Sequence, residues 1–265
     1  MASPIIRKSI SEFYGLVRGF SIDNKITDEE IAYLTQWKNN NLLFKNRKEI
    51  SDIFSTIDLI LEDGIVTIDE IINLQCVVSN YLDIVSTSST TLATQILDGI
   101  LRGITVDGKI TESECKNLRQ WLYDNIYLSD HFPFNKAMEM LNAVLADSIL
   151  TSEESAYILS TINELLNPVE CLKEQINSCE GKNICLSGNF EYGQKSEVEK
   201  VIIEKGGIIN STVKKTTDIL IIGNYECQAY SYGTYGTKVK KAIEYNEKGC
   251  DIKIIKESDF FSSIN

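Results

Sequence analysis

The sequence predicts a multidomain protein of the α and α/β classes. A duplicated helical bundle is followed by a module with a four-stranded parallel sheet flanked by helices. Two observations predict this fold: the first part repeats itself with helical spacing of its apolar residues, and the last part alternates apolar strands with helices. The length of 265 residues allows more than one packed core. We expect domains at residues 1–85, 92–170 and 178–265.

The helical part contains one unit of about 84 residues in two copies. GLVRGFSIDNKITDEEIAYLTQW (residues 15–37) matches GILRGITVDGKITESECKNLRQW (residues 99–121) without a gap. This match pairs Arg18 with Arg102. A run of serine and threonine at residues 86–91 lies near the joint, as expected for a linker.

Each copy contains two helix starts of the same design, a turn followed by Thr and, three residues later, Glu. The threonine hydroxyl can accept a hydrogen bond from the backbone N–H three residues on, where Glu30, Glu70, Glu114 and Glu154 stand. This pattern predicts two small helical bundles. Over residues 10–167 it resembles the TerB-like helical fold, which implies a scaffold with unsettled partners and no established activity.

The same turns are similar to the calcium-binding loop of EF-hands. With Ile26 at the apolar position of that loop, Ser21, Asp23 and Glu30 are the candidate ligands, and the first ligand position falls on Gly19. In the other three loops that position falls on Leu59, Gly103 and Ala143. Calcium requires six or more oxygen ligands, so we expect capped turns and no metal site.

Arg18 and Arg102 lie just before the turns of the two copies. Two roles are open for them. A guanidinium there can grip an anion, or it can form a structural ion pair with an acidic residue of the repeat such as Asp23 or Asp107. We favour the ion pair.

Charge is distributed unevenly along the chain. Residues 178–265 hold 12 lysines, no arginine and 12 acidic residues, so the preceding part carries the whole net charge of −12. An acidic surface repels DNA phosphates, and any nucleic-acid contact must therefore come from a local patch in the C-terminal part. We expect the acidic helical half to bind an unknown protein partner.

Composition also bears on location. No apolar run is long enough to span a bilayer, and the N-terminus lacks a basic segment followed by an apolar stretch. The seven cysteines are odd in number and no pair has CxxC spacing, which indicates free thiols in a reducing compartment. We expect a cytoplasmic protein without membrane contact.

The C-terminal part predicts the element order βαββαβα. The segment before the second strand ends in a glycine pair, and the third strand is fully apolar, as expected in a sheet covered on both faces. The predicted elements are a strand at 183–187, a helix at 196–205, strands from 208 and at 218–222, a helix at 237–248, a strand at 252–255 and a helix at 257–264.

Four blocks of this part, GKNICLSGNF, EKGGIINSTVKKTTDILIIG, GTKVKKAIEYNEKG and IKIIKESDFF, together resemble the BRCT domain, especially that of bacterial NAD-dependent DNA ligases and clamp-loader subunits. The resemblance covers the whole module. It implies a phosphate pocket in which Ser187 and Gly188 follow the first strand and Thr237 and Lys238 begin a helix. A hydroxyl, a bare backbone amide and an ammonium can then bind one anion at a helix N-terminus.

The module departs from the ligase form in a longer segment between the third strand and the next helix. It carries Tyr225, Tyr230, Tyr232 and Tyr235. Tyr232 and Tyr235, with Lys241, are candidates for contact with nucleic acid or peptide through stacking and charge. Alternatively, the tyrosines fold back on the module as a local cover. Lys214 and Lys215 form a second small basic cluster with the same candidate role.

No P-loop, nucleophile–base constellation, ligase lysine motif or HExxH is present. We therefore expect a non-enzymatic protein without a cofactor. Its BRCT-like module is expected to bind a phosphate-bearing partner, DNA ends or nicks in repair or replication. The alternative is an adaptor that reads a phosphopeptide or docks by BRCT pairing.

Overall fold

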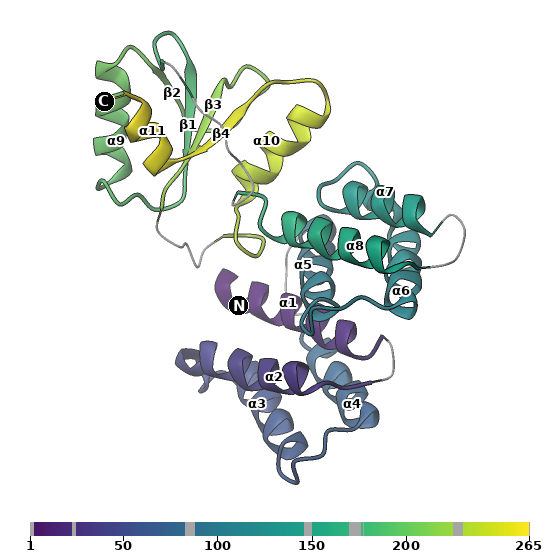
Figure 1. Ribbon diagram of the computed structural model, residues 1–265. Coiled ribbons are helices and arrows are strands. Elements are labelled where there is room, and N and C mark those ends of the chain that lie inside the picture. Colours follow the sequence, from purple (N-terminus) through teal and green to yellow (C-terminus); the bar gives the residue numbers. More distant parts are fainter. Residues whose placement is uncertain are drawn as a thin grey trace. The chain divides into compact units, whose positions relative to one another are not determined.

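The computed structural model describes residues 3–22, 25–82, 88–145, 150–169, 176, 178–224 and 230–264. The chain divides into two compact units, Met1–Leu166 and Asn167–Asn265 (Figure 1). The two predicted helical repeats therefore pack into one unit. Among the described residues, no helix combines the length and the apolar character that crossing a bilayer requires.

The helical unit contains four α-helices from each copy of the repeat, which confirms the predicted helical part. The first copy forms α1 (Pro4–Phe20), α2 (Asp28–Asn40), α3 (Lys48–Ile60) and α4 (Ile68–Ser79). The second forms α5 (Ser89–Gly103), α6 (Glu112–Asp124), α7 (Phe134–Val144) and α8 (Ser152–Leu166). In each copy a 3-10 turn, η1 (Leu42–Phe44) or η3 (Ile126–Leu128), follows the second helix.

The predicted capping interactions are present at all four helix starts. At α2, the Glu30 backbone N–H donates to the Thr27 hydroxyl at 3.2 Å, and the Thr27 N–H donates to the Glu30 carboxylate at 2.7 Å. The same reciprocal pair begins α4, α6 and α8. Each such cap contributes about 1 kcal/mol to helix stability.

These caps engage the glutamates that a calcium site would need. The Glu30 carboxylate, the last ligand position of the loop, accepts the Thr27 N–H. Asp23, another candidate ligand, lies outside the described residues, and the Ser21 hydroxyl donates to the Arg18 carbonyl oxygen at 3.0 Å. Within the described ranges, no group of three or more metal-ligating side chains occurs.

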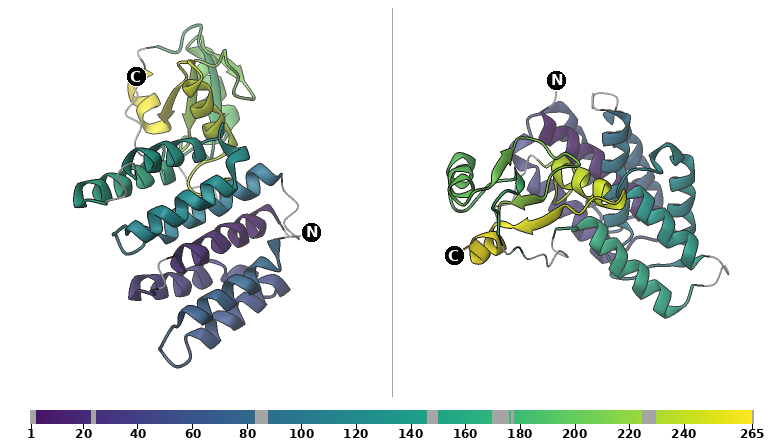
Figure 2. Two further views of the ribbon diagram at one scale, coloured as in Figure 1. Left: turned by 90° about the vertical axis from the view of Figure 1, so that its right-hand side faces the viewer. Right: turned by 90° about the horizontal axis from the view of Figure 1, so that it is seen from above.

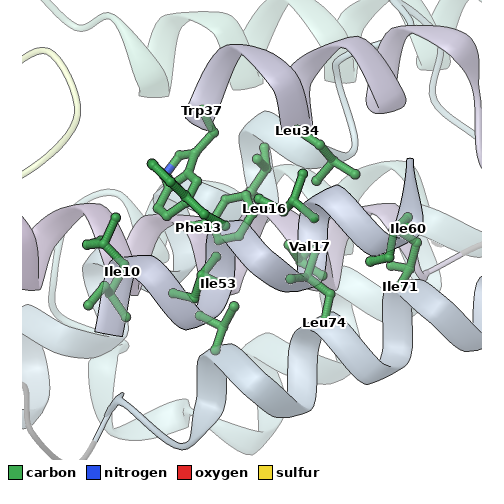
Figure 3. Close-up of a cluster of buried hydrophobic side chains, with 14 of the residues drawn as sticks. Ile10, Phe13, Leu16, Val17, Leu34, Trp37, Ile53, Ile60, Ile71 and Leu74 are labelled. Carbon is green, nitrogen blue, oxygen red and sulfur yellow. The ribbon is translucent and has the colours of Figure 1, made fainter. Parts of the chain in front are cut away.

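The core of the first copy is a cluster of buried apolar side chains from α1 to α4 (Figure 3). The Phe13 and Trp37 rings stack with their centroids 3.8 Å apart, and Phe54 meets the indole edge-on at 6.0 Å. Leu34 and Leu74 pack in the same cluster. Trp37 thus belongs to the core, as its helical spacing from Leu34 predicts.

The two copies meet through α1 and α5, which lie side by side in both views of the helical unit (Figures 1 and 2). Glycines allow their backbones to touch. A Cβ on Gly15 would lie 2.0 Å from the Ile96 carbonyl oxygen, and a Cβ on Gly99 would lie 2.0 Å from the Glu12 carbonyl oxygen. At the repeat offset Gly15 corresponds to Gly99 and Ile96 to Glu12, so each contact is the counterpart of the other. The two copies therefore meet through the same surface, as the subunits of an isologous dimer do.

One predicted ion pair has a different partner. Arg102 Nε donates to Asp98 Oδ2 at 2.8 Å, one turn earlier on α5, whereas the Asp107 carboxylate accepts the backbone N–H of Lys109 at 2.9 Å. The predicted pair of Arg102 with Asp107 is therefore wrong, because the turn itself engages Asp107. The pair of Arg18 with Asp23 falls on a residue outside the described ranges.

The C-terminal unit has the predicted βαββαβα order. Its elements are β1 (Asn183–Ser187), α9 (Lys195–Glu204), β2 (Ile208–Asn210), β3 (Ile219–Ile222), α10 (Thr237–Glu247), β4 (Lys253–Lys256) and α11 (Glu257–Ile264). The strands form one parallel sheet in the order β2-β1-β3-β4. Helices α9 and α11 cover one face of the sheet and α10 covers the other (Figure 1). This confirms the predicted α/β fold.

Replacing Gly99 with Ala tests the contact between the copies. In a helix interior this change normally adds about 1 kcal/mol of stability. We expect Gly99→Ala instead to lower the free energy of unfolding by about 3 kcal/mol, because the added Cβ forces α1 and α5 apart. Urea denaturation followed by circular dichroism measures the change.

Gly64→Ala is the control, because a Cβ there has no neighbour within 4 Å. It reports only the cost of a positive φ, about 1–2 kcal/mol. A smaller loss in Gly99→Ala than in Gly64→Ala contradicts the close backbone contact.

Candidate functional site

The predicted phosphate-binding residues lie at the carboxyl ends of the central strands, where open parallel sheets place their ligands. Ser187 is the last residue of β1 and is 5% exposed. Its carbonyl oxygen accepts the backbone N–H of Gly223, just after β3, at 3.0 Å. The ends of β1 and β3 are thus joined directly at the site.

Lys238 reaches this corner from the first turn of α10. Its Nζ donates to the Leu186 carbonyl oxygen at 2.8 Å, one residue before Ser187. An ammonium has three N–H donors, so this bond leaves donor capacity for a ligand. The structure therefore places the Lys238 ammonium at the end of β1, where Leu186 precedes Ser187 and Gly188 in the chain.

Tyr230 covers the same corner. Gly188 has a φ of +81°, and a Cβ on it would lie 2.4 Å from the Tyr230 hydroxyl oxygen. A Cβ on Gly236, at the start of α10, would lie 3.0 Å from Cδ1 of the same ring. Tyr230 thus extends from the helix start to the glycine of the candidate pocket. The Tyr230 hydroxyl therefore lies against Gly188, beside the candidate pocket.

Thr237 is the exposed first residue of α10. Its hydroxyl lies 3.2 Å from the hydroxyl of Ser231, in hydrogen-bonding distance. The tyrosine segment therefore contacts the helix start as well as Gly188. Thr237 and Lys238 are the first two residues of α10, and the Lys238 ammonium reaches the Leu186 carbonyl oxygen at the end of β1.

Tyr232 and Tyr235 are core residues in this structure, with exposures of 4% and 1%. They form a tight turn in which each backbone N–H donates to the other's carbonyl, at 3.1 and 2.8 Å. Rings buried in this way cannot stack on bases or a peptide without unfolding the turn. The structure supports the alternative, a local cover, for Tyr230, Tyr232 and Tyr235, whereas Tyr225 lies outside the described residues.

Lys240 lies beneath this cover. Its Nζ is 5.0 Å from the centroid of the Tyr232 ring and 3.7 Å from the Glu244 carboxylate. Burial lowers the pKa of Lys240, and the nearby Glu244 carboxylate opposes this shift. Lys240 stands beside Lys238 and Lys241 in the sequence, but it is 5% exposed and packs against the cover.

The other predicted lysines do not join the pocket. Lys214 and Lys215 are exposed and precede β3, at the amino ends of the parallel strands, which is the opposite end of the sheet from Ser187. Lys241 is partly buried, with its Nζ 5.5 Å from the centroid of Tyr245 on its own helix.

Sequence reasoning missed Glu257, the residue that orders the strand-end loops. It is only 2% exposed, and its carboxylate accepts three backbone N–H groups. The donors are Glu191 at 2.9 Å, Tyr192 at 2.8 Å and Asn224 at 3.0 Å. Glu257 thereby ties the loop after β1 to the loop after β3. Its only signal in the sequence was a carboxylate directly after an apolar strand.

Glu257→Gln tests this tie. An amide can offer one acceptor oxygen but places an NH2 group against a backbone donor, so a buried N–H loses its partner. We expect the free energy of unfolding to fall by about 2–3 kcal/mol. Chemical denaturation measures it, with Asp259→Asn on the exposed side of α11 as the matched control. Equal stability of the two variants would show that the three bonds contribute little.

Comparison with known proteins places this site in a family. The sequence model of the BRCA1 C Terminus (BRCT) domain matches residues 175–264. A DNA ligase of Clostridium novyi (strain NT) is 28% identical over 170 residues, covering 61% of this chain and 23% of the ligase. DNA ligases of Mycoplasmopsis synoviae (strain 53) and Mycoplasmopsis pulmonis (strain UAB CTIP) are 30% and 29% identical over 111 and 153 residues.

The alignments with the two Mycoplasmopsis ligases cover 42% and 56% of this chain and 14% and 20% of the ligases. The chain thus spans less than a quarter of the length of these relatives. No solved structure matches the chain.

Proposed function

Because residues 175–264 form a BRCT domain, we propose that this protein binds a phosphate group of DNA, at an end or a nick, in repair or replication. The observation that carries the proposal is the position of Lys238, bound to the Leu186 carbonyl beside Ser187 and Gly188. Thr237 and the N-terminus of α10 add a hydroxyl and backbone donors on the same side. The relatives are DNA ligases, which supports DNA as the partner.

The proposal describes a binding protein and not an enzyme. The sequence supplies no ligase lysine motif and no nucleophile with a positioned base. The similarity to the ligases covers only a small part of their length. A module of this kind recruits or positions a partner.

A phosphopeptide is the second candidate ligand, and the net charge of −12 favours it. The excess of acidic over basic residues precedes the BRCT domain in the chain, and a DNA duplex carries many more phosphates than a phosphopeptide does. Repulsion by a net negative protein therefore weakens DNA binding more strongly. Under this alternative the same Lys238 corner holds a phosphorylated side chain.

Lys238→Ala tests the pocket. We expect the full chain to bind a nicked duplex with a 5′-phosphate at least about tenfold more weakly after this change, because a charge-assisted contact is lost. Binding of the same duplex without the 5′-phosphate should change little. Fluorescence anisotropy at one fixed salt concentration measures each affinity.

Lys248→Ala is the matched control, because Lys248 is exposed just beyond the opposite end of α10. Equal affinities of wild type and Lys238→Ala for the phosphorylated nick would overturn the pocket. A Lys238-dependent preference for a phosphoserine peptide over the nick would select the second candidate.

Tyr230→Ala tests the cover. If the Tyr230 hydroxyl must leave before phosphate binds at Gly188, its removal raises the fraction of binding-competent molecules and the apparent affinity rises. We expect a severalfold gain for the phosphorylated nick in the same anisotropy assay. Tyr230→Phe, which keeps the ring, separates the hydroxyl from the ring. A loss of affinity in Tyr230→Ala would make Tyr230 part of the binding surface.

A further inference from the structure

A pocket of about 230 Å³ lies in the helical unit, where the end of α1 meets α6 of the other copy. Arg18, Ser21 and Ile22 line it from the first copy. Asn117, Gln120 and Trp121 line it from α6. It combines a guanidinium and two side-chain amides with an indole wall, which is the composition of a small-ligand site.

The duplication supplies an internal reference for Arg18. Its counterpart Arg102 is bound by Asp98, whose side chain is 4% exposed, with Nε 2.8 Å from Oδ2. Burial alone would lower the pKa of Arg102, but the charge and hydrogen bond of Asp98, helped by the Glu12 carboxylate, raise it above its ordinary value. In this copy the guanidinium is held by carboxylates of the chain itself.

Around Arg18 these carboxylates are absent from the equivalent positions. At the repeat offset, Asp98 corresponds to Tyr14 and Glu12 corresponds to Ile96. Within the described residues, no acidic side chain lies within ion-pair distance of Arg18. Arg18 is partly buried, so its guanidinium is incompletely solvated there and favours an anionic partner.

The surrounding polar groups are held in place by the chain. Asn117 Nδ2 donates to the Ile22 carbonyl oxygen at 3.1 Å, and the Ser21 hydroxyl donates to the Arg18 carbonyl oxygen at 3.0 Å. Gln120 Nε2 donates to the Asp124 carboxylate at 2.9 Å. The pocket is therefore formed before a ligand arrives, which reduces the entropy cost of binding.

We propose that this pocket binds a single carboxylate carried on an apolar stem, either an acidic side chain of a partner protein or a free monocarboxylate. The Arg18 guanidinium hydrogen-bonds the carboxylate, as Arg102 does to Asp98 in the other copy, and the stem packs on Ile22 and on the edge of Trp121 that lines the pocket. The Asp124 carboxylate also lines the pocket and repels a doubly charged phosphate more strongly than a carboxylate.

Nuclear magnetic resonance of the full chain tests this site. The chain has two tryptophans, so the indole N–H signal of Trp121 is separated from that of Trp37 by a Trp37→Phe variant. Butyrate represents a free carboxylate and N-acetyl-glutamate N-methylamide represents an acidic side chain of a partner. We expect saturable shifts of the Trp121 signal with at least one of them, and the tighter probe identifies the source.

Arg18→Gln should weaken this binding by about tenfold or more, because the charge-assisted pair is lost. Arg119→Gln, on α6 but not among the residues that line the pocket, is the control. An unchanged Trp37 signal shows that each variant is folded. The proposal is overturned by no saturable shift with either probe, by equal binding in Arg18→Gln, or by tighter binding of inorganic phosphate. None of these outcomes depends on Lys238, so this test is independent of the test of the phosphate pocket.

Discussion

The helical unit depends on backbone contact between α1 and α5. Gly15 and Gly99 each leave room for a carbonyl oxygen of the other helix, where a methyl group would stand 2.0 Å away. The contact is reciprocal because the two helices are copies of one sequence. The contact also determines which residues surround Arg18 and Arg102, because each arginine lies three residues after the glycine of its helix. A residue that differs between the copies, such as Asp98 in one and Tyr14 in the other, therefore gives Arg102 and Arg18 different surroundings.

The C-terminal unit has a comparable constraint at its strand ends. A Cβ on Gly223 would lie 1.9 Å from the Asn189 carbonyl oxygen, so the loops after β1 and β3 also touch backbone to backbone. Glu257 holds both loops by accepting three of their N–H groups. The corner where Ser187, Gly188 and Lys238 meet is consequently rigid on the sheet side. Tyr230, which contacts it through a side chain, is the part that can move without breaking those bonds.

Much of this architecture could be predicted because its signals are local or periodic. The repeat offset, the Thr–Glu caps and the alternation of strand and helix are visible in short stretches of sequence, and the structure confirms them. The partner of Arg102 could not be predicted, because Asp98 and Asp107 are both near it in sequence and only the turn geometry decides between them. The burial of Tyr232 and the role of Glu257 depend on contacts between distant segments, which no local pattern reports.

Under the proposed function, the charge distribution and the site geometry together limit what kind of phosphate the BRCT domain can select. Lys214 and Lys215 lie at the opposite end of the sheet from Lys238, so these three lysines do not form one continuous basic track along which a duplex backbone can lie. With about one phosphate neutralised at the Lys238 corner, counterion release contributes little affinity, and the salt dependence of binding should be shallow. Selectivity must then come from the second charge and extra oxygen of a terminal phosphate, which a cradle of hydroxyl, amide and ammonium can use and an internal phosphodiester cannot supply.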